Sequence, residues 1–403
     1  MPRRSSIFLL APLLACKPPV EAPPPSQPEP IVAAPKTERE VASETCYAST
    51  FEWNMGDEIF LGALRIEGYS VVLTTSPDPR VVRRWNEATP DEPSWFELPL
   101  TEAPLGLRSL PVLSDPPAFA LVAETSRDPI LLEIPVDEPA RVHSLPDRLV
   151  PIAALRGREG QLVHVGRDAR SLRVIGPAGS TTLTATCPSL DDAACVIATS
   201  RATIEGDHVL ALRILSDARD ELHLVRITAD GSLAWERELD DLPRETDAWG
   251  PGEAFGPALL RVEPTRVLVV HATRRIFVRY VDPASGTTRA LAINDPPTDS
   301  WQTAWTPIAL TPIDEGYAIV TRHFDEYWKE VTLGVVEVDD SHAKFGAPSP
   351  FWSSPETLVA SLDESHAGMV RLYVASVYGE NRAFGSWRSL EIDPKCVVAS
   401  AKR

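Results

Sequence analysis

The sequence lacks the motifs that most often mark an active site. It has no HExxH pattern, no GxSxG elbow, no CxxC pair and no DxDxDG-like acidic loop. Signatures of zinc peptidases, serine hydrolases, structural zinc sites and calcium loops are therefore missing. The eight histidines are scattered, and none stands at metal-ligand spacing from a second histidine and a carboxylate. On motifs alone we expect no catalytic residue, no metal and no cofactor.

Long apolar runs and basic charge are also scarce. The longest apolar stretch near the N-terminus, residues 7–14, is far shorter than the ~20 residues that a membrane-spanning helix needs. Lysine and arginine number 39 against 57 acidic residues, which gives a formal net charge of −18. Nucleic acid repels such a polyanion, so we expect no nucleic-acid partner.

The short apolar run is typical of an export signal. It follows Arg3 and Arg4 and ends in Leu13-Leu14-Ala15-Cys16. This ending resembles the lipobox of bacterial lipoproteins, in which a cysteine receives a diacylglycerol before cleavage. The resemblance implies that residues 1–15 are a signal peptide and that a lipidated Cys16 begins the mature chain. An ordinary secretory signal with an incidental cysteine is the alternative.

A proline-rich segment follows, and we expect residues 16–44 to be a disordered stalk. It holds eight prolines between Pro18 and Pro35. At ~3.1 Å per residue in a polyproline conformation, such a stalk spans up to roughly 80 Å. In the lipoproteins that this chain resembles, an aspartate after the cysteine causes retention at the inner membrane. Lys17 stands there instead, so we expect an exported protein anchored through lipid at the outer membrane, facing the periplasm or the surface.

Residues 45–403 contain seven similar units. Apolar strand-like segments begin at residues 70, 118, 161, 208, 266, 316 and 369, which are 43 to 58 residues apart. A strand-like segment precedes each one, a third follows after a polar hairpin, and a fourth usually comes after a Gly, Pro or Asp turn. This pattern is typical of β-propeller blades. We predict an all-β, seven-bladed β-propeller of four-stranded antiparallel blades. A pair of β-sandwiches or a β-helix is the alternative.

One unit resembles the repeats of known propellers. The stretch LVRITADGSLAWEREL, residues 224–239, is similar to quinoprotein-like and WD40-like repeats, in which a strand, an Asp-Gly turn and a Leu-x-Trp strand follow one another. Asp230-Gly231 suits a tight turn with positive φ, and Trp235 is expected to fill the gap between blades. Quinone-dependent dehydrogenases of this fold carry a vicinal cysteine pair and metal-binding acids, which we do not find, so the resemblance implies the fold and not the cofactor.

Four cysteines remain once Cys16 is lipidated, and in an oxidising compartment they allow two disulfides with three connectivities. Propellers commonly close by pairing an N-terminal strand with C-terminal strands in one blade, which predicts that Cys46 lies beside Cys396. Such a bridge contributes at most roughly 5 to 6 kcal/mol by loop entropy. Cys187 and Cys195 lie between blades three and four, where a local bridge contributes about 2 to 3 kcal/mol.

Aromatic residues gather in the predicted connections of blades five to seven. Together with the hairpins between second and third strands, these connections share one rim around the central channel of a propeller. Aromatic side chains on a rim are typical of recognition surfaces. Burial of the same side chains between blades is the alternative. The candidate rim residues are Trp249, Phe255, Trp301, Trp305, Tyr327, Trp328, Phe351 and Trp352.

These features predict a lipid-anchored binding or scaffolding module of the cell envelope, with an envelope protein or a glycan as its partner. An exported glycan hydrolase or lyase that uses carboxylates of the rim or channel is the rival hypothesis. A structural domain without a small ligand is the third. We interpret His164 and His271 as structural residues on strands, and acidic pairs such as Asp339-Asp340 as solvated turn residues.

Overall fold

A computed structural model of the chain describes most residues between Cys46 and Cys396. The chain separates into two units, Met1–Lys36 and Thr37–Arg403, and all described residues belong to the second. They are residues 46–53, 58–66, 69–76, 78–87, 89, 93–113, 116–145, 149–168, 171–186, 196–216, 219–239, 258–272, 276–293, 304–313, 316–324, 329–345, 349–354, 357–364, 370–378, 383–394 and 396.

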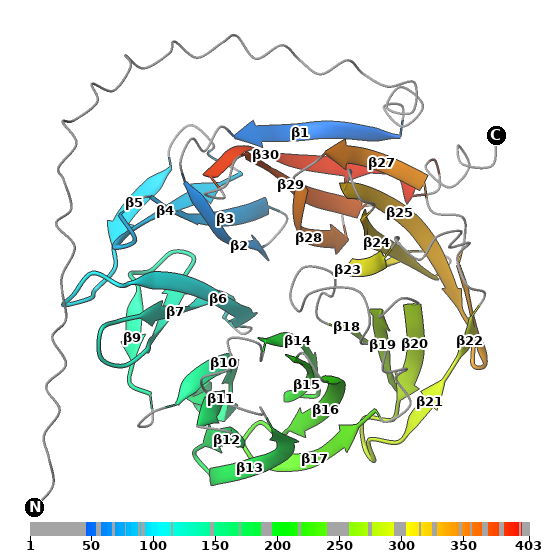
Figure 1. The fold of residues 1–403 in the computed structure, drawn as a ribbon, viewed down its shortest axis with the longest axis horizontal. Coiled ribbons are helices and arrows are strands. Elements are labelled where there is room, and N and C mark those ends of the chain that lie inside the picture. The colour runs from blue at the N-terminus through cyan, green and yellow to red at the C-terminus, as the bar shows by residue number, and fades with distance from the viewer. Residues whose placement is uncertain are drawn as a thin grey trace, which may run out of the picture. The chain divides into compact units, whose positions relative to one another are not determined.

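The described residues form seven β-sheets, six of which have four strands (Figure 1). The first four sheets each contain four consecutive strands in chain order. They contain β2 (Ile59–Ile66), β3 (Tyr69–Thr75), β4 (Val81–Asn86) and β5 (Ser94–Glu97); β6 (Gly106–Leu113), β7 (Ala118–Glu124), β8 (Ile130–Pro135) and β9 (Arg141–His143); β10 (Val150–Arg156), β11 (Leu162–Asp168), β12 (Ser171–Gly176) and β13 (Gly179–Thr186); and β14 (Val196–Ile204), β15 (Asp207–Ser216), β16 (Arg219–Ile227) and β17 (Leu233–Glu238).

The fifth sheet follows the same pattern, and the last two depart from it at their edges. These three sheets contain β18 (Leu259–Val262), β19 (Val267–Ala272), β20 (Ile276–Val281) and β21 (Thr288–Ala290); β22 (Ala292–Ile293), β23 (Ala304–Ile313), β24 (Gly316–Phe324), β25 (Lys329–Val338), β26 (His342–Phe345) and β27 (Ser349–Ser354); and β28 (Thr357–Glu364), β29 (Val370–Tyr378), β30 (Ala383–Ile392) and β1 (Tyr47–Trp53). A short 3-10 turn, η1 (Arg158–Gly160), also occurs. None of the helical segments in the described residues is long and apolar enough to cross a membrane.

The all-β class is confirmed, and five of the seven sheets are four-stranded up-and-down meanders, the pattern typical of β-propeller blades. Consecutive strands within the sheets pair antiparallel, which excludes the β-helix alternative because its strands are parallel. The sheets follow one another through their first strands. The contacting pairs are β2 with β6, β6 with β10, β10 with β14, β14 with β18, β18 with β23, β23 with β28, and β28 with β2.

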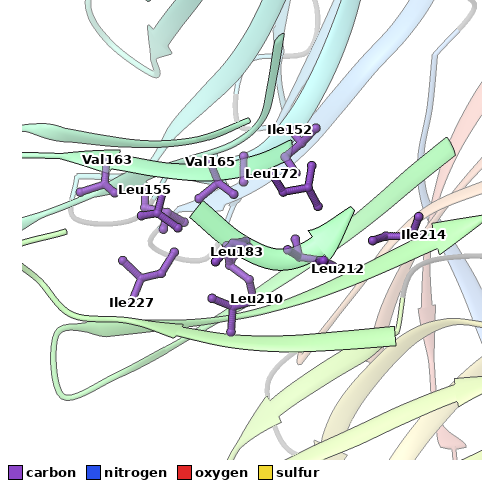
Figure 2. Close-up of a cluster of buried hydrophobic side chains, with 14 residues drawn as sticks. Ile152, Leu155, Val163, Val165, Leu172, Leu183, Leu210, Leu212, Ile214 and Ile227 are labelled. Carbon is purple, nitrogen blue, oxygen red and sulfur yellow. The ribbon is translucent and has the colours of Figure 1, made fainter. Parts of the chain in front are cut away.

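The core lies between consecutive sheets. Figure 2 shows one such cluster, in which Leu155 and Val165 of the β10–β13 sheet face Leu210 and Leu212 of the β14–β17 sheet. These side chains are fully buried, and each contributes roughly 1.5–3 kcal/mol relative to exposure. Alternate residues of a strand face opposite sheets, so each central strand is apolar on both faces.

The predicted Asp-Gly turn and the tryptophan that follows it are confirmed. Gly231 has a φ of 86°, the left-handed conformation that glycine adopts without strain. Trp235 on β17 is buried in a cluster with Val267 and Val269 of the next sheet. Its indole Nε1 donates to the carbonyl of Pro283, 2.8 Å away, so this ring joins two sheets as expected.

The N-terminal strand β1 pairs antiparallel with β30, so the first and last described strands share one sheet (Figure 1). A disulfide joins Cys46 to Cys396, with Cα atoms 5.4 Å apart. The backbone N–H of Asp393 also donates to the carbonyl of Cys46 at 3.0 Å. Cys187 and Cys195 lie outside the described residues.

The β23–β26 sheet differs from the expected four-stranded blade. Its long strand β25 pairs with β26 at one end and with β27 at the other, so two segments share the position of the fourth strand. A strand left unpaired over half its length would expose backbone groups without partners, and β27 satisfies them. The short strand β22 adds a parallel pair with β26.

Candidate functional site

The predicted aromatic rim is only partly described. Trp249, Phe255, Trp301, Tyr327 and Trp328 lie outside the described residues. The other three lie on strands, which corrects their assignment to connections, while their role in a recognition rim stays a prediction.

Trp305 belongs to β23, which begins at Ala304, and its register partner is His323. Phe351 and Trp352 belong to β27, where Trp352 pairs with Val331 and Phe351 falls at a bulge.

An exposed aromatic residue that the sequence analysis missed lies on a different sheet. Trp95 on the edge strand β5 is 47% exposed. Arg83 on β4 is its register partner, and the guanidinium carbon lies 3.8 Å from the centre of the Trp95 ring and 4.3 Å from that of Trp85. Cross-strand partners and residues two apart share a face of a sheet, so the three side chains form one stack.

A buried carboxylate holds this stack in place. Glu58 accepts a 2.6 Å hydrogen bond from Arg83 and a 2.5 Å hydrogen bond from Thr74. The Trp85 indole donates to the Thr74 hydroxyl at 3.2 Å. Burial lowers the pKa of Arg83, and Glu58 partly offsets that effect. The Arg83–Trp95 stack is therefore a cationic and aromatic surface whose arginine is already held by Glu58.

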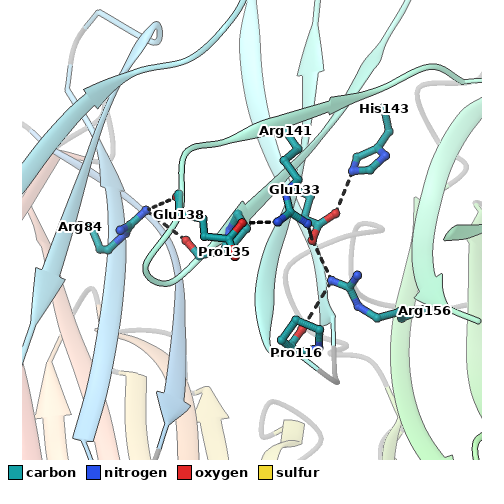
Figure 3. Close-up of polar contacts among 8 residues, drawn as sticks. All are labelled: Arg84, Pro116, Glu133, Pro135, Glu138, Arg141, His143 and Arg156. Atoms are coloured by element: carbon teal, nitrogen blue, oxygen red, sulfur yellow. Dashed lines mark hydrogen bonds and ion pairs between the residues drawn. The ribbon is translucent and has the colours of Figure 1, made fainter. Parts of the chain in front are cut away.

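A second polar network joins the β6–β9 and β10–β13 sheets (Figure 3). Glu133 on β8 is only 2% exposed and accepts hydrogen bonds from Arg156 of β10 at 2.7 Å and from His143 at 2.8 Å. Burial raises the pKa of Glu133, but Arg156 and His143 outweigh burial and hold it below its usual value. Arg84 reaches from the preceding sheet to the carbonyls of Pro135 and Glu138. These polar groups are occupied in holding sheets together.

A third group combines a histidine with carboxylates between the β10–β13 and β14–β17 sheets. Glu221 and His223 on β16 and Glu238 on β17 each offer one ligand atom, and these atoms lie within 4.8 Å of one another. Among the residues that the structure describes, they are the one cluster of three or more metal-ligating side chains. It lies on the third and fourth strands of its sheet, away from β14, the first strand, which contacts the first strands of the adjacent sheets.

Strand alternation places this group. Leu222 and Leu224 pack into the cluster shared with the following sheet, so Glu221 and His223 face the preceding one. His223 and Glu238 are register partners across the Asp230-Gly231 hairpin. Glu236, two residues before Glu238, accepts the backbone N–H groups of Thr184 at 2.7 Å and Ala185 at 2.9 Å, both on β13.

Charge in this group is dominated by carboxylates. His223 Nδ1 lies 3.5 Å from Glu236 Oε1, and Nε2 lies 3.7 Å from Glu221 Oε2. Burial lowers the pKa of His223, but Glu236, Glu238 and Glu221 together raise it above its usual value. Burial raises the pKa of Glu236, whereas His223 and the two backbone donors lower it to about 2. The group therefore holds negative charge that a cation can neutralise.

The sequence marked the hairpin that carries this group, but not the pairing of its residues. The Asp230-Gly231 turn predicts that β16 and β17 are neighbours, but a bulge between Arg226 and Ile227 shifts the register by one residue before His223 pairs with Glu238, so counting from the turn alone does not identify this pair. Motif searches missed it because the ligands come from two strands of a hairpin rather than from one local pattern.

The comparisons with known proteins establish no family. No protein-family model and no curated protein matches the chain. Among solved structures, it is similar to the β-propeller domain of Cps50 (Swd1) from Myceliophteria thermophila, at 13% identity and a TM-score of 0.47, covering 84% of this chain and 98% of that one. It is also similar to the polysaccharide lyase Uly1, at 10% identity and a TM-score of 0.43, covering 84% and 90%. At these values neither similarity carries an argument about function.

Proposed function

We propose that this protein is an exported, lipid-anchored, seven-bladed β-propeller that binds an envelope protein or a glycan. The export signal with Cys16 and the proline-rich residues 16–44 support the anchor and the tether.

Support for a closed ring of seven blades comes from three observations. The first strands of successive sheets contact one another in a cycle that returns from β28 to β2. Strand β1 pairs with β30, and Cys46 is bonded to Cys396. Peptide mapping without reduction tests the closure. We expect one linked pair of peptides containing residues 46 and 396, and unlinked peptides would contradict the ring.

The Arg83–Trp95 stack is the observation that carries the binding role. Tryptophan and arginine are enriched at recognition surfaces because they bury much area with little loss of conformational freedom. Here the tryptophan is half exposed, while Glu58 already fixes the arginine beneath it. A ligand that stacks on Trp95 would therefore meet an ordered surface. Glycan rings and the apolar side chains of a protein partner both suit such a stack.

The anchor is tested by fractionating cells that express the full chain or its Cys16→Ser variant. We expect the parent chain in the membrane fraction with an N-terminal peptide heavier by its acyl chains, and the variant released. Equal membrane association of both chains would contradict lipid anchoring.

The binding role is tested with the full chain carrying Cys16→Ser, which removes the lipid. Purified cell-wall glycan and detergent-solubilised envelope proteins serve as separate probes, and Trp95→Ala is compared with the exposed-surface control Val142→Ala. We expect Trp95→Ala alone to abolish retention on one of the two probes. Shortening of the glycan probe would favour the enzyme hypothesis, and retention unchanged by Trp95→Ala would contradict the proposed surface.

A further inference from the structure

The geometry of Glu221, His223 and Glu238 points to a binding site for a divalent transition-metal cation, and we propose that these three residues are its protein ligands. Zinc bonds to nitrogen and carboxylate oxygen are about 2.0–2.2 Å long, so its ligand atoms lie roughly 3.4 Å apart in a tetrahedral site. The three ligand atoms here already lie within 4.8 Å of one another. A shift of the carboxylates by about an ångström therefore completes the coordination.

His223 is the observation that separates this group from an ordinary acidic surface. Its side chain is about 97% buried, yet neither ring nitrogen has a hydrogen-bond partner among the described residues. Buried polar groups are normally hydrogen-bonded, and because Nδ1 stands 3.5 Å from Glu236, Nε2 is the ring nitrogen that lacks a partner. Nε2 points toward Glu221 at 3.7 Å, too long for a hydrogen bond. A cation between them would satisfy both groups.

The surroundings of His223 match the outer shell of metal sites. A metal-bound histidine typically donates its second ring N–H to a carboxylate that fixes its orientation. Glu236 stands beside Nδ1 at 3.5 Å and is itself held by the backbone N–H groups of Thr184 and Ala185. This carboxylate therefore orients the ring so that Nε2 faces Glu221.

The donor set selects the class of cation. One imidazole nitrogen and two carboxylate oxygens suit zinc and its first-row neighbours, whereas calcium prefers six or more oxygens. Glu238 is exposed and Glu221 is partly exposed, so an ion can reach the site from solvent. With three protein ligands, a water molecule can occupy the fourth coordination position. Because Glu236 is bound to β13, occupancy would also stiffen the contact between two sheets.

The test measures zinc on the full mature chain after removal of metal by a chelator. The variants are Glu238→Gln, which removes an exposed ligand, Glu236→Gln, which removes the orienting carboxylate, and Asp339→Asn as control. Asp339 pairs with His342 at 3.7 Å on the surface and lies outside any three-residue cluster of the described part. Zinc content is determined by mass spectrometry of the element, affinity by titration, and geometry by the visible spectrum of the cobalt-substituted protein.

We expect about one zinc ion per chain to be lost in Glu238→Gln and retained in Asp339→Asn, and a tetrahedral cobalt spectrum in the parent chain. Glu236→Gln should keep the stoichiometry but weaken affinity about 10- to 100-fold, as outer-shell changes do. Equal zinc content in the parent chain and Glu238→Gln would overturn the proposal. So would a parent chain that takes up no zinc, since His223 would then be an imidazolium held by carboxylates only.

Discussion

Two contacts between sheets place a histidine beside a buried glutamate. In one, cationic side chains surround a single carboxylate, whereas in the other, carboxylates surround a single histidine. Around Glu133, arginines 141 and 156 and His143 supply the positive charge that one carboxylate needs (Figure 3). His223 lies within ion-pair distance of the carboxylates of Glu221 and Glu236, and Glu238 is the third carboxylate of the group. Glutamate and histidine thus form a charge-balanced contact between sheets in one place and a group with excess negative charge in the other.

Removing the carboxylate from the charge-balanced contact should have the largest effect on stability. In Glu133→Gln the guanidinium of Arg156, which is only 8% exposed, loses its charged partner. Breaking a buried ion pair from one side costs about 3–5 kcal/mol. Urea unfolding of the Cys16→Ser chain measures the change in the free energy of unfolding.

Glu138→Gln is the matched control, because Glu138 pairs with Arg141 at the surface of the same network. We expect a change within about 0.5 kcal/mol, as for exposed ion pairs. A loss in Glu133→Gln no larger than this would show that the network does not hold the two sheets together.

The corresponding change in the negatively charged group should cost less. Glu236→Gln replaces one acceptor oxygen by an NH₂ group that faces the N–H of Thr184 or Ala185. Loss of one charge-assisted hydrogen bond costs about 1–3 kcal/mol, and relief of repulsion from Glu238 offsets part of it. The same unfolding assay with excess chelator isolates this effect. A loss as large as that in Glu133→Gln would remove the distinction between the two contacts.

The sequence pattern predicted the sheets far better than it predicted these sites. Periodic apolar segments and Gly, Pro or Asp turns identify strands locally, and the Asp230-Gly231 turn marks β16 and β17 as neighbours, although a bulge between Arg226 and Ile227 shifts their register. The split fourth strand made by β26 and β27 escaped prediction, because it depends on which half of β25 remains unpaired. Which half remains unpaired depends on long-range strand pairing and not on the conformational preference of the local sequence.

The candidate sites escaped for a related reason. Arg83, Trp95 and Glu58 are ordinary residues in the sequence, and their stack depends on cross-strand register. The Glu221–His223–Glu238 group likewise depends on the cross-strand register of β16 and β17. Trp305, Phe351 and Trp352 were assigned to connections because the ends of strands are the least defined feature of an apolar pattern.

A third buried histidine extends the comparison to a positively charged setting. His271 on β19 stacks on Phe277 at 5.1 Å between ring centres and lies near Arg213 and Arg279. Burial, followed by the two arginines, lowers its pKa to about 3. In the unfolded chain the pKa of a histidine is ~6.5, so as pH falls the unfolded chain binds this proton before the folded chain does.

His271 should therefore weaken the fold as pH falls from about 6.5 toward 3, and its neutral form costs nothing above that range. The slope attributable to this group approaches about 1.4 kcal/mol per pH unit. Comparing the free energy of unfolding at pH 7 and pH 5 for the parent chain and His271→Leu measures it. The variant should lose less stability between the two pH values, and equal losses would contradict the assignment.

Apart from the control Glu138→Gln, the smallest expected effect on stability belongs to the exposed stack. Trp95→Ala removes a cation–π contact worth about 0.5–1 kcal/mol, while Glu58 still holds Arg83. Trp85→Ala should cost several times more, because Trp85 is buried and donates to Thr74. A binding defect in Trp95→Ala with near-parental urea unfolding would separate recognition from folding. If Trp95→Ala destabilises the chain as much as Trp85→Ala, Trp95 belongs to the core of its sheet, and the proposed binding surface loses its main support.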